Sequence, residues 1–170
     1  MSEIIPTALT IVVVIGTLTF LYIIFSKNIK SHKIKIDEAE SALDELLDEK
    51  HELLILTSKI IIKETDVDKK IFDDLKKIKE QNLSVFGLDE KLTDSNNLIL
   101  KIADDFSGVK ESDKFNEIMF SINDLDEKLE ATKLFYNKYA ELLNSSASKI
   151  PTNIIAKILR IEDKDFFEID

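Results

Sequence analysis

The N-terminal part of the chain is one uninterrupted apolar run. From Ile4 to Phe25 the sequence contains no charged residue. A helix over these positions would be about 33 Å long at 1.5 Å per residue, which matches a hydrocarbon core of about 30 Å. Pro6 falls in the first turn, where a missing N–H costs little, and Tyr22 falls near the other end, where an amphipathic ring suits the membrane interface. The pattern predicts a transmembrane helix.

Four lysines follow the apolar run and set its predicted orientation. They are Lys27, Lys30, Lys33 and Lys35, and no Lys or Arg precedes the run. Because positive residues are retained on the cytoplasmic side, we expect a single-pass protein of the cell membrane with a short N-terminus outside and a cytoplasmic C-terminal domain. The same lysines can also contact anionic lipid headgroups, which is compatible with their role in topology.

A cleaved signal peptide is the alternative interpretation of this segment. Such a peptide opens with positive charge and ends at a small-residue cleavage site. This chain has Glu3 before the apolar run, the lysines after it, and no small-x-small site at its end. The pattern therefore favours a retained anchor.

Beyond the lysines, apolar residues recur at alternating spacings of three and four, which indicates the seam of a long helix. The first series is Ile36, Ala39, Leu43, Leu46, Leu53 and Ile60, with Lys50 and Thr57 in two of its slots. A second row widens the seam, as a bundle helix requires: Leu47, Leu54 and Ile61. No Gly or Pro occurs between Lys27 and Lys63, so the transmembrane helix can continue into this segment.

Two shorter helical elements are expected next. The first begins at Thr65-Asp66 with Asp66 as its N-cap, and its inward positions are Val67, Ile71, Leu75 and Ile78. The segment from Asn82 to Gly87 is typical of a turn. The second helix ends at Ser107-Gly108, and residues 94–97 could interrupt it. Its expected buried positions are Leu88, Leu92, Ile99, Ile102 and Phe106.

The longest soluble element starts near Ser112, and Pro151 interrupts it. Its seam is Phe115, Ile118, Ile122, Leu125, Leu129, Thr132, Tyr136, Tyr139, Leu143, Ala147 and Ile150. A final short helix is expected from Asn153 to Ile161. Long helices joined by short turns predict an all-α fold, in which an N-terminal transmembrane helix is followed by an elongated antiparallel up-down bundle. We divide the chain into an anchor (1–26), a basic juxtamembrane segment (27–35) and a cytoplasmic helical domain (36–170).

Composition narrows the range of functions. The 170 residues include three Gly, two Pro and no Cys, and the net charge is −10. Few turn residues favour long helices, and the missing cysteines exclude disulfides, thiolate nucleophiles and Cys-ligated zinc. An acidic surface repels phosphates, so no nucleic-acid partner is expected.

The last third of the chain carries a recognisable series of residues. Tyr136-Asn137 is followed seven residues later by Leu143-Asn144, and after these come Pro151, Asn153, Ala156 and Phe166-Phe167-Glu168. This order resembles the C-terminal signature of the LemA family. The chain departs from that pattern at Leu143, where the family has Tyr, at Ile150, where it has Phe, and at Arg160-Ile161, where it has Gly-Phe. The resemblance implies a bacterial, membrane-anchored helical protein without an agreed activity.

The signature residues have two interpretations. Asn137 and Asn144 lie seven residues apart, so one helix face carries both, and a buried Asn fixes the register between helices by demanding hydrogen-bond partners. Pro151 stops the long helix. Helical spacing favours a packing role for these residues, and binding of a ligand is the alternative.

Little in the sequence indicates catalysis. Asp48 and His51 stand three residues apart, but a helical di-metal site needs a second such pair, and His32 is the only other histidine. No phosphate-binding or nucleophile motif occurs, so we expect neither an enzyme nor a cofactor. The remaining cluster is an acidic series, interpreted as a solvated face or a weak cation surface: Asp37, Glu38, Glu40, Asp44, Glu45, Asp48 and Glu49.

Two classes of function remain. The first is a membrane-anchored helical scaffold or interaction protein, whose expected partners are the lipid bilayer, other copies of the chain in a weak homo-oligomer, and an unknown membrane or cytoplasmic protein. The second is an accessory regulator of a membrane enzyme or of an envelope stress-response system. A stable stoichiometric partner would favour regulation, and self-association alone would favour scaffolding.

Overall fold

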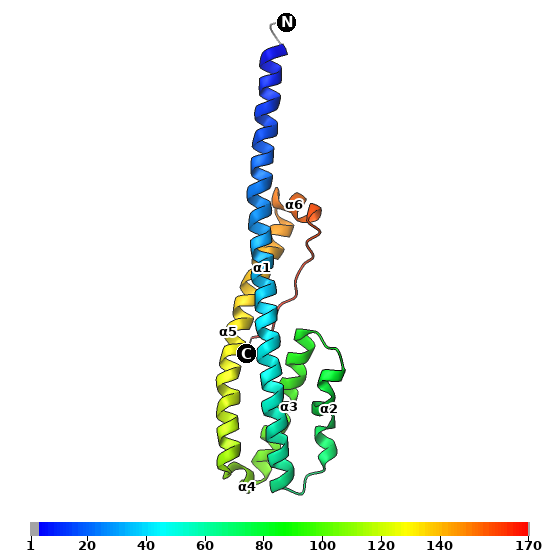
Figure 1. Cartoon of the computed structure of the whole chain (residues 1–170), viewed down its shortest axis with the longest axis vertical. Coiled ribbons are helices and arrows are strands. Elements are labelled where there is room, and N and C mark those ends of the chain that lie inside the picture. Colours follow the sequence, from blue (N-terminus) through cyan, green and yellow to red (C-terminus); the bar gives the residue numbers. More distant parts are fainter. Residues whose placement is uncertain (1–3, 170) are drawn as a thin grey trace. The chain divides into compact units, whose positions relative to one another are not determined.

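The computed structural model describes residues 4–169, and every regular element in that range is helical (Figure 1). This confirms the predicted all-α fold. In chain order the elements are α1 (Ile4–Glu64), η1 (Lys69–Phe72), α2 (Asp73–Lys77), η2 (Ile78–Glu80), α3 (Val85–Asp105), α4 (Ser107–Lys110), α5 (Asp113–Ser148) and α6 (Thr152–Ile158).

The chain packs as two compact units that share α1 and α5. Unit 1 comprises Met1–Glu38 with Tyr136–Phe166, and unit 2 comprises Ala39–Phe135 with Phe167–Asp170. Helix α1 is continuous over 61 residues, because its long middle stretch has no Gly or Pro to end it. The expected continuation of the apolar helix into the following segment is therefore confirmed.

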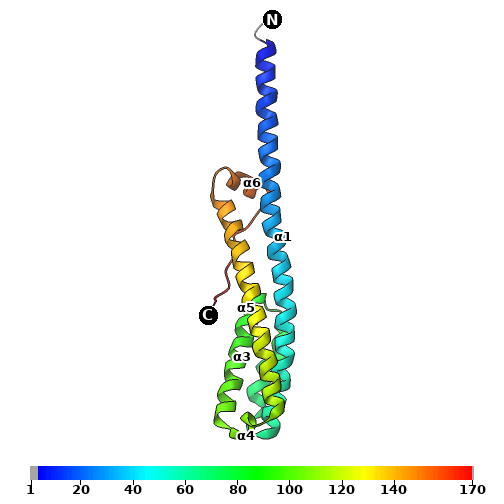
Figure 2. The same ribbon diagram turned by 90° about the vertical axis from the view of Figure 1, so that its left-hand side faces the viewer.

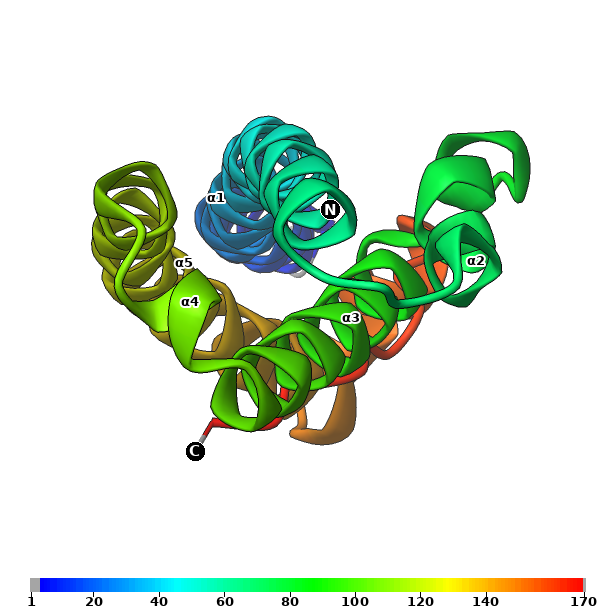
Figure 3. The same cartoon turned by 90° about the horizontal axis from the view of Figure 1, so that it is seen from below.

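Unit 2 is an up-down arrangement of helices around the C-terminal part of α1. The chain descends in α1, returns through α2, descends again in α3 and rises in α5 (Figure 1). Seen along the helices, this part of α1 has α5 on one side and α3 with α2 on the other (Figure 3). Its fully buried side chains include Leu43, Leu47, Leu54, Ile61, Phe72, Leu92, Ile99, Ile122 and Leu125.

The predicted seam of α1 is buried at most of its positions and displaced by one residue at the others. The buried predicted positions are Ile36, Ala39, Leu43, Lys50 and Thr57. Leu47, Leu54 and Ile61 are 0% exposed, whereas the predicted seam residues Leu46, Leu53 and Ile60 are half-buried. A helix that packs between neighbours on two sides needs a wider apolar stripe than a two-stranded seam provides. The buried stripe therefore combines the predicted seam with the row that the sequence indicated as its widening.

Two predicted boundaries before α3 are wrong for local reasons. The N-cap after α1 is Asp68, whose Oδ1 accepts a hydrogen bond of 3.0 Å from the Lys70 amide, so Asp66 does not cap the element. The turn ends at Ser84, whose Oγ accepts from the Gly87 amide at 3.3 Å and thereby caps α3. Gly87 consequently lies inside the helix. Asn82, with a φ of 49°, supplies the left-handed residue of the turn.

Three predicted inward side chains are exposed instead. Ile71 is 43% exposed, and Phe72 takes its buried position because the segment begins as a 3₁₀ helix with a different period. Phe106 is 38% exposed because it lies in the extended link between α3 and α4. Ile150 is 82% exposed because α5 ends at Ser148.

Unit 1 is an antiparallel pair of helix segments closed by α6. The stretch of α1 that follows the apolar segment and the C-terminal part of α5 run side by side in opposite directions (Figures 1 and 2). The rings of His32 and Tyr139 lie 6.0 Å apart across this pair. Partial burial lowers the pKa of His32. The buried side chains of unit 1 include Ile29, Ile36, Tyr136, Ala140, Leu143, Ile155 and Ala156.

Helix α6 ends three residues earlier than predicted, in a Schellman motif. The Arg160 amide donates to the Lys157 carbonyl at 3.1 Å, and the Ile161 amide donates to the Ala156 carbonyl at 3.0 Å. Arg160 therefore takes the left-handed conformation, with a φ of 53°. A side chain with a Cβ is strained there, and glycine is the residue that usually occupies this position.

We predict that Arg160→Gly stabilises α6 by about 0.5–1 kcal/mol, because it relieves left-handed strain. Hydrogen exchange of the α6 amides in the full-length chain measures the effect. Lys157→Gly is the matched control, since it places glycine at an exposed helical position and should destabilise α6 by about 0.5–1 kcal/mol. Faster exchange in Arg160→Gly would contradict the assigned conformation.

Candidate functional site

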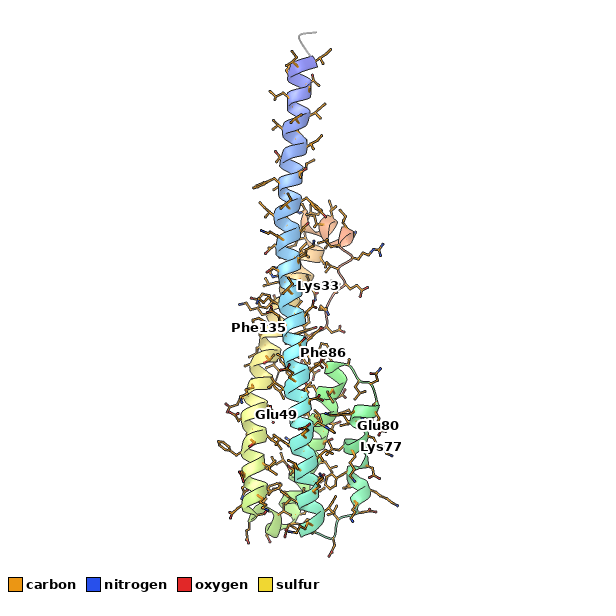
Figure 4. The ribbon with its side chains drawn as sticks, in the orientation of Figure 1. Lys33, Glu49, Lys77, Glu80, Phe86 and Phe135 are labelled. Atoms are coloured by element: carbon orange, nitrogen blue, oxygen red, sulfur yellow. The ribbon has the colours of Figure 1, made fainter. Side chains whose placement is uncertain are left out.

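The apolar segment of α1 has no protein cover. Every side chain from Ile4 to Ile24 is exposed, as Figure 4 shows, and none of the most apolar window of α1 is buried. The core helix of a soluble protein would be mostly buried. Within the described residues, α1 is the one helix long and apolar enough to cross a membrane, judged by its length and composition.

Three threonine hydroxyls of this segment are satisfied within the helix. The hydroxyls of Thr10, Thr17 and Thr19 donate to the carbonyls four residues earlier at 2.8–2.9 Å. Such bonds leave no hydroxyl proton that needs water, which suits an apolar environment. Gly16 has no atom within 4 Å of the place where its Cβ would be, so no close helix contact within the chain explains it.

The four lysines after the segment differ in exposure. Lys27, Lys30 and Lys33 are exposed, and Lys33 is labelled in Figure 4. The Nζ of Lys35 lies 2.7 Å from Glu38 Oε2, and this hydrogen bond, with the charge of Glu38, raises the pKa of Lys35. Lys35 thus has a carboxylate partner within the helix, whereas the other three present their charges to solvent.

Asn144 holds the C-terminal segment of unit 1 against α5. Its Nδ2 donates to the Lys164 carbonyl at 2.8 Å, and its Oδ1 accepts from the Lys164 amide at 2.9 Å. An extended backbone has no helix or sheet partner, so this pair of bonds satisfies groups that burial would otherwise leave unpaired. The same side chain and Phe166, which is 51% exposed, line a surface hollow of about 470 Å³.

The other signature residues of unit 1 mostly pack inward. Tyr136 is 0% exposed, and Leu143 and Ala156 are also buried. Asn137 and Asn153 are half-buried, and the Oδ1 of Asn153 is buried without a hydrogen-bond partner within the described residues. Pro151 is exposed in the turn between α5 and α6.

Phe167 anchors the C-terminal tail on unit 2. Its ring stacks on Phe86 with centroids 4.0 Å apart and an interplanar angle of 14°, and Lys133 Nζ lies 5.8 Å from the Phe167 centroid. Phe86, labelled in Figure 4, is on the first turn of α3. The lysine also pairs with Asp89 Oδ2 at 2.6 Å. Stacking and the cation–π contact together fix the tail.

A second ion pair lies deeper in unit 2. Lys50 is 4% exposed, and its Nζ lies 2.6 Å from Asp126 Oδ1. Both residues line a polar pocket of about 250 Å³, together with Lys133, Glu168, Thr93, Asn96, Asn97, Leu129, Glu130 and Ile169. Each of its lysines already has a carboxylate partner, so the pocket offers no uncompensated cation to a substrate. The spacing of apolar residues predicted that Lys50 lies in the seam, but it did not indicate that Asp126 is its partner.

The pair of residues considered for a metal is used otherwise. The Nε2 of His51 lies 2.8 Å from the Leu75 carbonyl, so it carries a proton and donates. Asp48 Oδ1 lies 3.2 Å from Lys79 Nζ. Among residues 4–169 no group of three His, Asp or Glu side chains could hold a metal ion.

The acidic series lies along α1 and is exposed except at Glu40, which is half-buried. Partial desolvation, with the nearby charges of Asp48 and Glu40, raises the pKa of Asp44. Desolvation is the larger cause of this higher pKa, and repulsion between carboxylates four residues apart on the helix adds to it. The acidic side chains along α1 are therefore solvated and weakly repel one another.

We predict that Asn144→Ala destabilises the protein by about 1–3 kcal/mol, because the Lys164 backbone loses both hydrogen bonds. Thermal unfolding of the full-length chain measures the change. Ser146→Ala is the control, since the Ser146 hydroxyl only donates to Leu142 within its own helix. Equal melting temperatures of the two variants would show that the hydrogen bonds between Asn144 and Lys164 contribute nothing to stability.

Substitution of the two members of the ion pair between Lys50 and Asp126 should destabilise the protein to different extents. Asp126→Asn leaves the Lys50 charge buried without compensation and should cost about 1–3 kcal/mol. Lys50→Met removes the buried charge and leaves a partly exposed carboxylate that water can solvate, so its cost should be smaller. Denaturant unfolding ranks the two variants, and the opposite order would refute this assignment of the buried charge.

Comparison of the sequence with known proteins tests the resemblance to the LemA family. No curated protein and no solved structure matches the chain significantly. The model of the LemA family matches residues 39–170, which include both units' signature residues and most of α1 beyond the apolar segment. A match over that share of the sequence identifies the family, and the chain belongs to the LemA family.

Proposed function

We propose that this LemA-type protein is a membrane-anchored, non-catalytic scaffold that works through contacts between proteins. The uncovered apolar segment of α1 is the observation that carries the anchoring, because a helix of this length without protein cover needs a hydrocarbon solvent. The exposed lysines at its end favour a cytoplasmic location for the rest of the chain.

The use of the signature residues supports a role without catalysis. Asn144 holds the backbone of Lys164, Tyr136 is buried in the core, and Phe167 fixes the tail on α3. Each side chain is occupied by the fold rather than aimed at a substrate. The polar pocket of unit 2 contains two lysines that already have carboxylate partners, two amides, and the carboxylates of Glu130 and Glu168, so its cations are not free to hold an anionic substrate.

One surface of unit 2 suits contact with a second copy of the chain. A groove of about 480 Å³ is lined by Leu56, Ile60 and Ile118, with Lys59 and Lys114 among the residues on its rim. Phe120, two residues from Ile118 on α5, is 76% exposed. An exposed aromatic side chain beside an apolar groove is self-complementary, as a two-fold interface requires.

The direction of the helices allows this pairing, and the groove contains charges of both signs. Lys59, Lys114 and Glu117 line the groove, and Asp124 lies one turn beyond Phe120. A two-fold axis parallel to the helices keeps both α1 helices in the same direction, as two chains anchored in one bilayer require. Anchoring in two dimensions raises the effective concentration, so a weak contact is sufficient.

Crosslinking in membranes tests the proposal. With a Cys at Ser121 as the reporter, Phe120→Ser should weaken pairing at least about tenfold, because each copy loses a buried aromatic side chain. Leu134→Ser is the matched control, since Leu134 is 51% exposed on the same helix but lies four turns away. Unchanged crosslinking would refute the proposal that this surface forms the interface between two copies. A stoichiometric foreign partner recovered in mild detergent would instead favour an accessory regulator.

A further inference from the structure

Helix α6 and the turn before it present three exposed isoleucines. Ile154 and Ile158 are 59% and 61% exposed and stand four residues apart within α6, which places them on one side of the helix, and Ile150, 82% exposed, lies in the turn that precedes α6. The opposite side packs inward through Ile155 and Ala156. A helix of seven residues thus buries one apolar side in unit 1 and leaves a second apolar side uncovered.

Basic residues flank these isoleucines. Lys149, Lys157 and Arg160 are exposed, and the segment from Lys149 to Ile161 contains no acidic residue. The chain as a whole has a net charge of −10, so a segment with three cations and no anion departs from its surroundings. Cations beside exposed aliphatic side chains are the features of a helix that lies in a bilayer interface.

The antiparallel pair in unit 1 brings α6 to the end of the apolar segment. His32 and Tyr139 face each other across α1 and α5. Nine residues beyond Tyr139 is Ser148, the last residue of α5, and nine residues before His32 is Ile23, about 14 Å along each helix. The turn into α6 therefore lies level with the last apolar residues of α1, and Figures 1 and 2 both show α6 beside this part of α1.

We propose that α6 is a second membrane-binding element, whose isoleucines enter the interface of an anionic bilayer next to the transmembrane segment. This inference rests on the proposed anchoring. Ile150, Ile154 and Ile158 reach the boundary of the acyl chains, about 5–10 Å into the interface. Lys149, Lys157 and Arg160 bind lipid phosphates.

Cations of α1 extend the same binding surface. Lys27 and Lys30 are exposed one or two turns after Ile23, at the level of α6 in unit 1. Their positive charges attract anionic headgroups, and the long alkyl stems of Lys and Arg let the charges reach the phosphates while the isoleucines lie deeper. Unit 1 is then held to the bilayer by the segment that crosses it and by a helix that lies on it.

Spin labels in the full-length chain test this arrangement, because the absence of native cysteine permits single-site labelling. The chain is reconstituted in nanodiscs of phosphatidylcholine mixed with phosphatidylglycerol, with a label at Ile154→Cys or Ile158→Cys. We expect low accessibility to a water-soluble nickel chelate and high accessibility to oxygen at both sites. Val14→Cys reports the hydrocarbon core, and Asp113→Cys reports bulk water.

The outcomes separate the inference from the anchoring on which it rests. If Val14→Cys is accessible to nickel, the anchoring itself fails. If Val14→Cys is in lipid while both α6 labels match Asp113→Cys, the anchoring stands and the docking of α6 is overturned. The double substitution Lys149→Glu with Lys157→Glu should return the Ile154→Cys label to water by several-fold in nickel accessibility. An unchanged depth would overturn the role of these cations.

Discussion

The absence of protein cover over the first turns of α1 is the constraint on which the rest of the molecule depends. More than ten large apolar side chains between Ile4 and Ile24 are exposed. Each would gain roughly 1.5–3 kcal/mol on leaving water, and their total exceeds the 5–15 kcal/mol by which a domain is usually stable. Keeping this segment in water is therefore costly, and the proposed bilayer removes the cost.

The family signature is then explained as part of the packing that follows the anchor. Asn144 supplies the backbone of Lys164 with hydrogen bonds, and Phe167 stacks on Phe86. Both contacts fasten an extended segment that has no regular structure of its own. Within unit 1, the Schellman motif at Arg160 and the bonds of Asn144 to Lys164 fix the two ends of the segment that follows α6.

Periodicity was sufficient to predict the helices but not their partners. Long helices, the continuity of α1 and the buried seam of α5 follow from local spacing and from the scarcity of Gly and Pro. The contact between Phe86 and Phe167 and the pairing of Lys50 with Asp126 join residues far apart in the sequence, and spacing carries no information about them. Caps depend on single side chains, so Asp68 and Ser84 displaced two predicted boundaries.

Asn144 was expected to fix the register between helices, whereas its side chain is half-buried and bonds to the backbone of Lys164, in an extended segment twenty residues away. The exposure of Ile150, Ile154 and Ile158 was not predicted, because the seam of α5 was extended through Ile150, beyond the end of the helix. Both errors arise where the chain turns, since a turn changes the period on which the prediction rests.

Labelling of single cysteines in intact cells tests the central claim most directly. Ser2, which lies outside the described residues, and Ser148, at the exposed end of α5, stand on either side of the apolar segment. A chain that crosses the membrane with its helical domain inside should react with an impermeant thiol reagent at Ser2→Cys and not at Ser148→Cys until the cells are lysed. Reaction at Ser148→Cys in intact cells would contradict this arrangement.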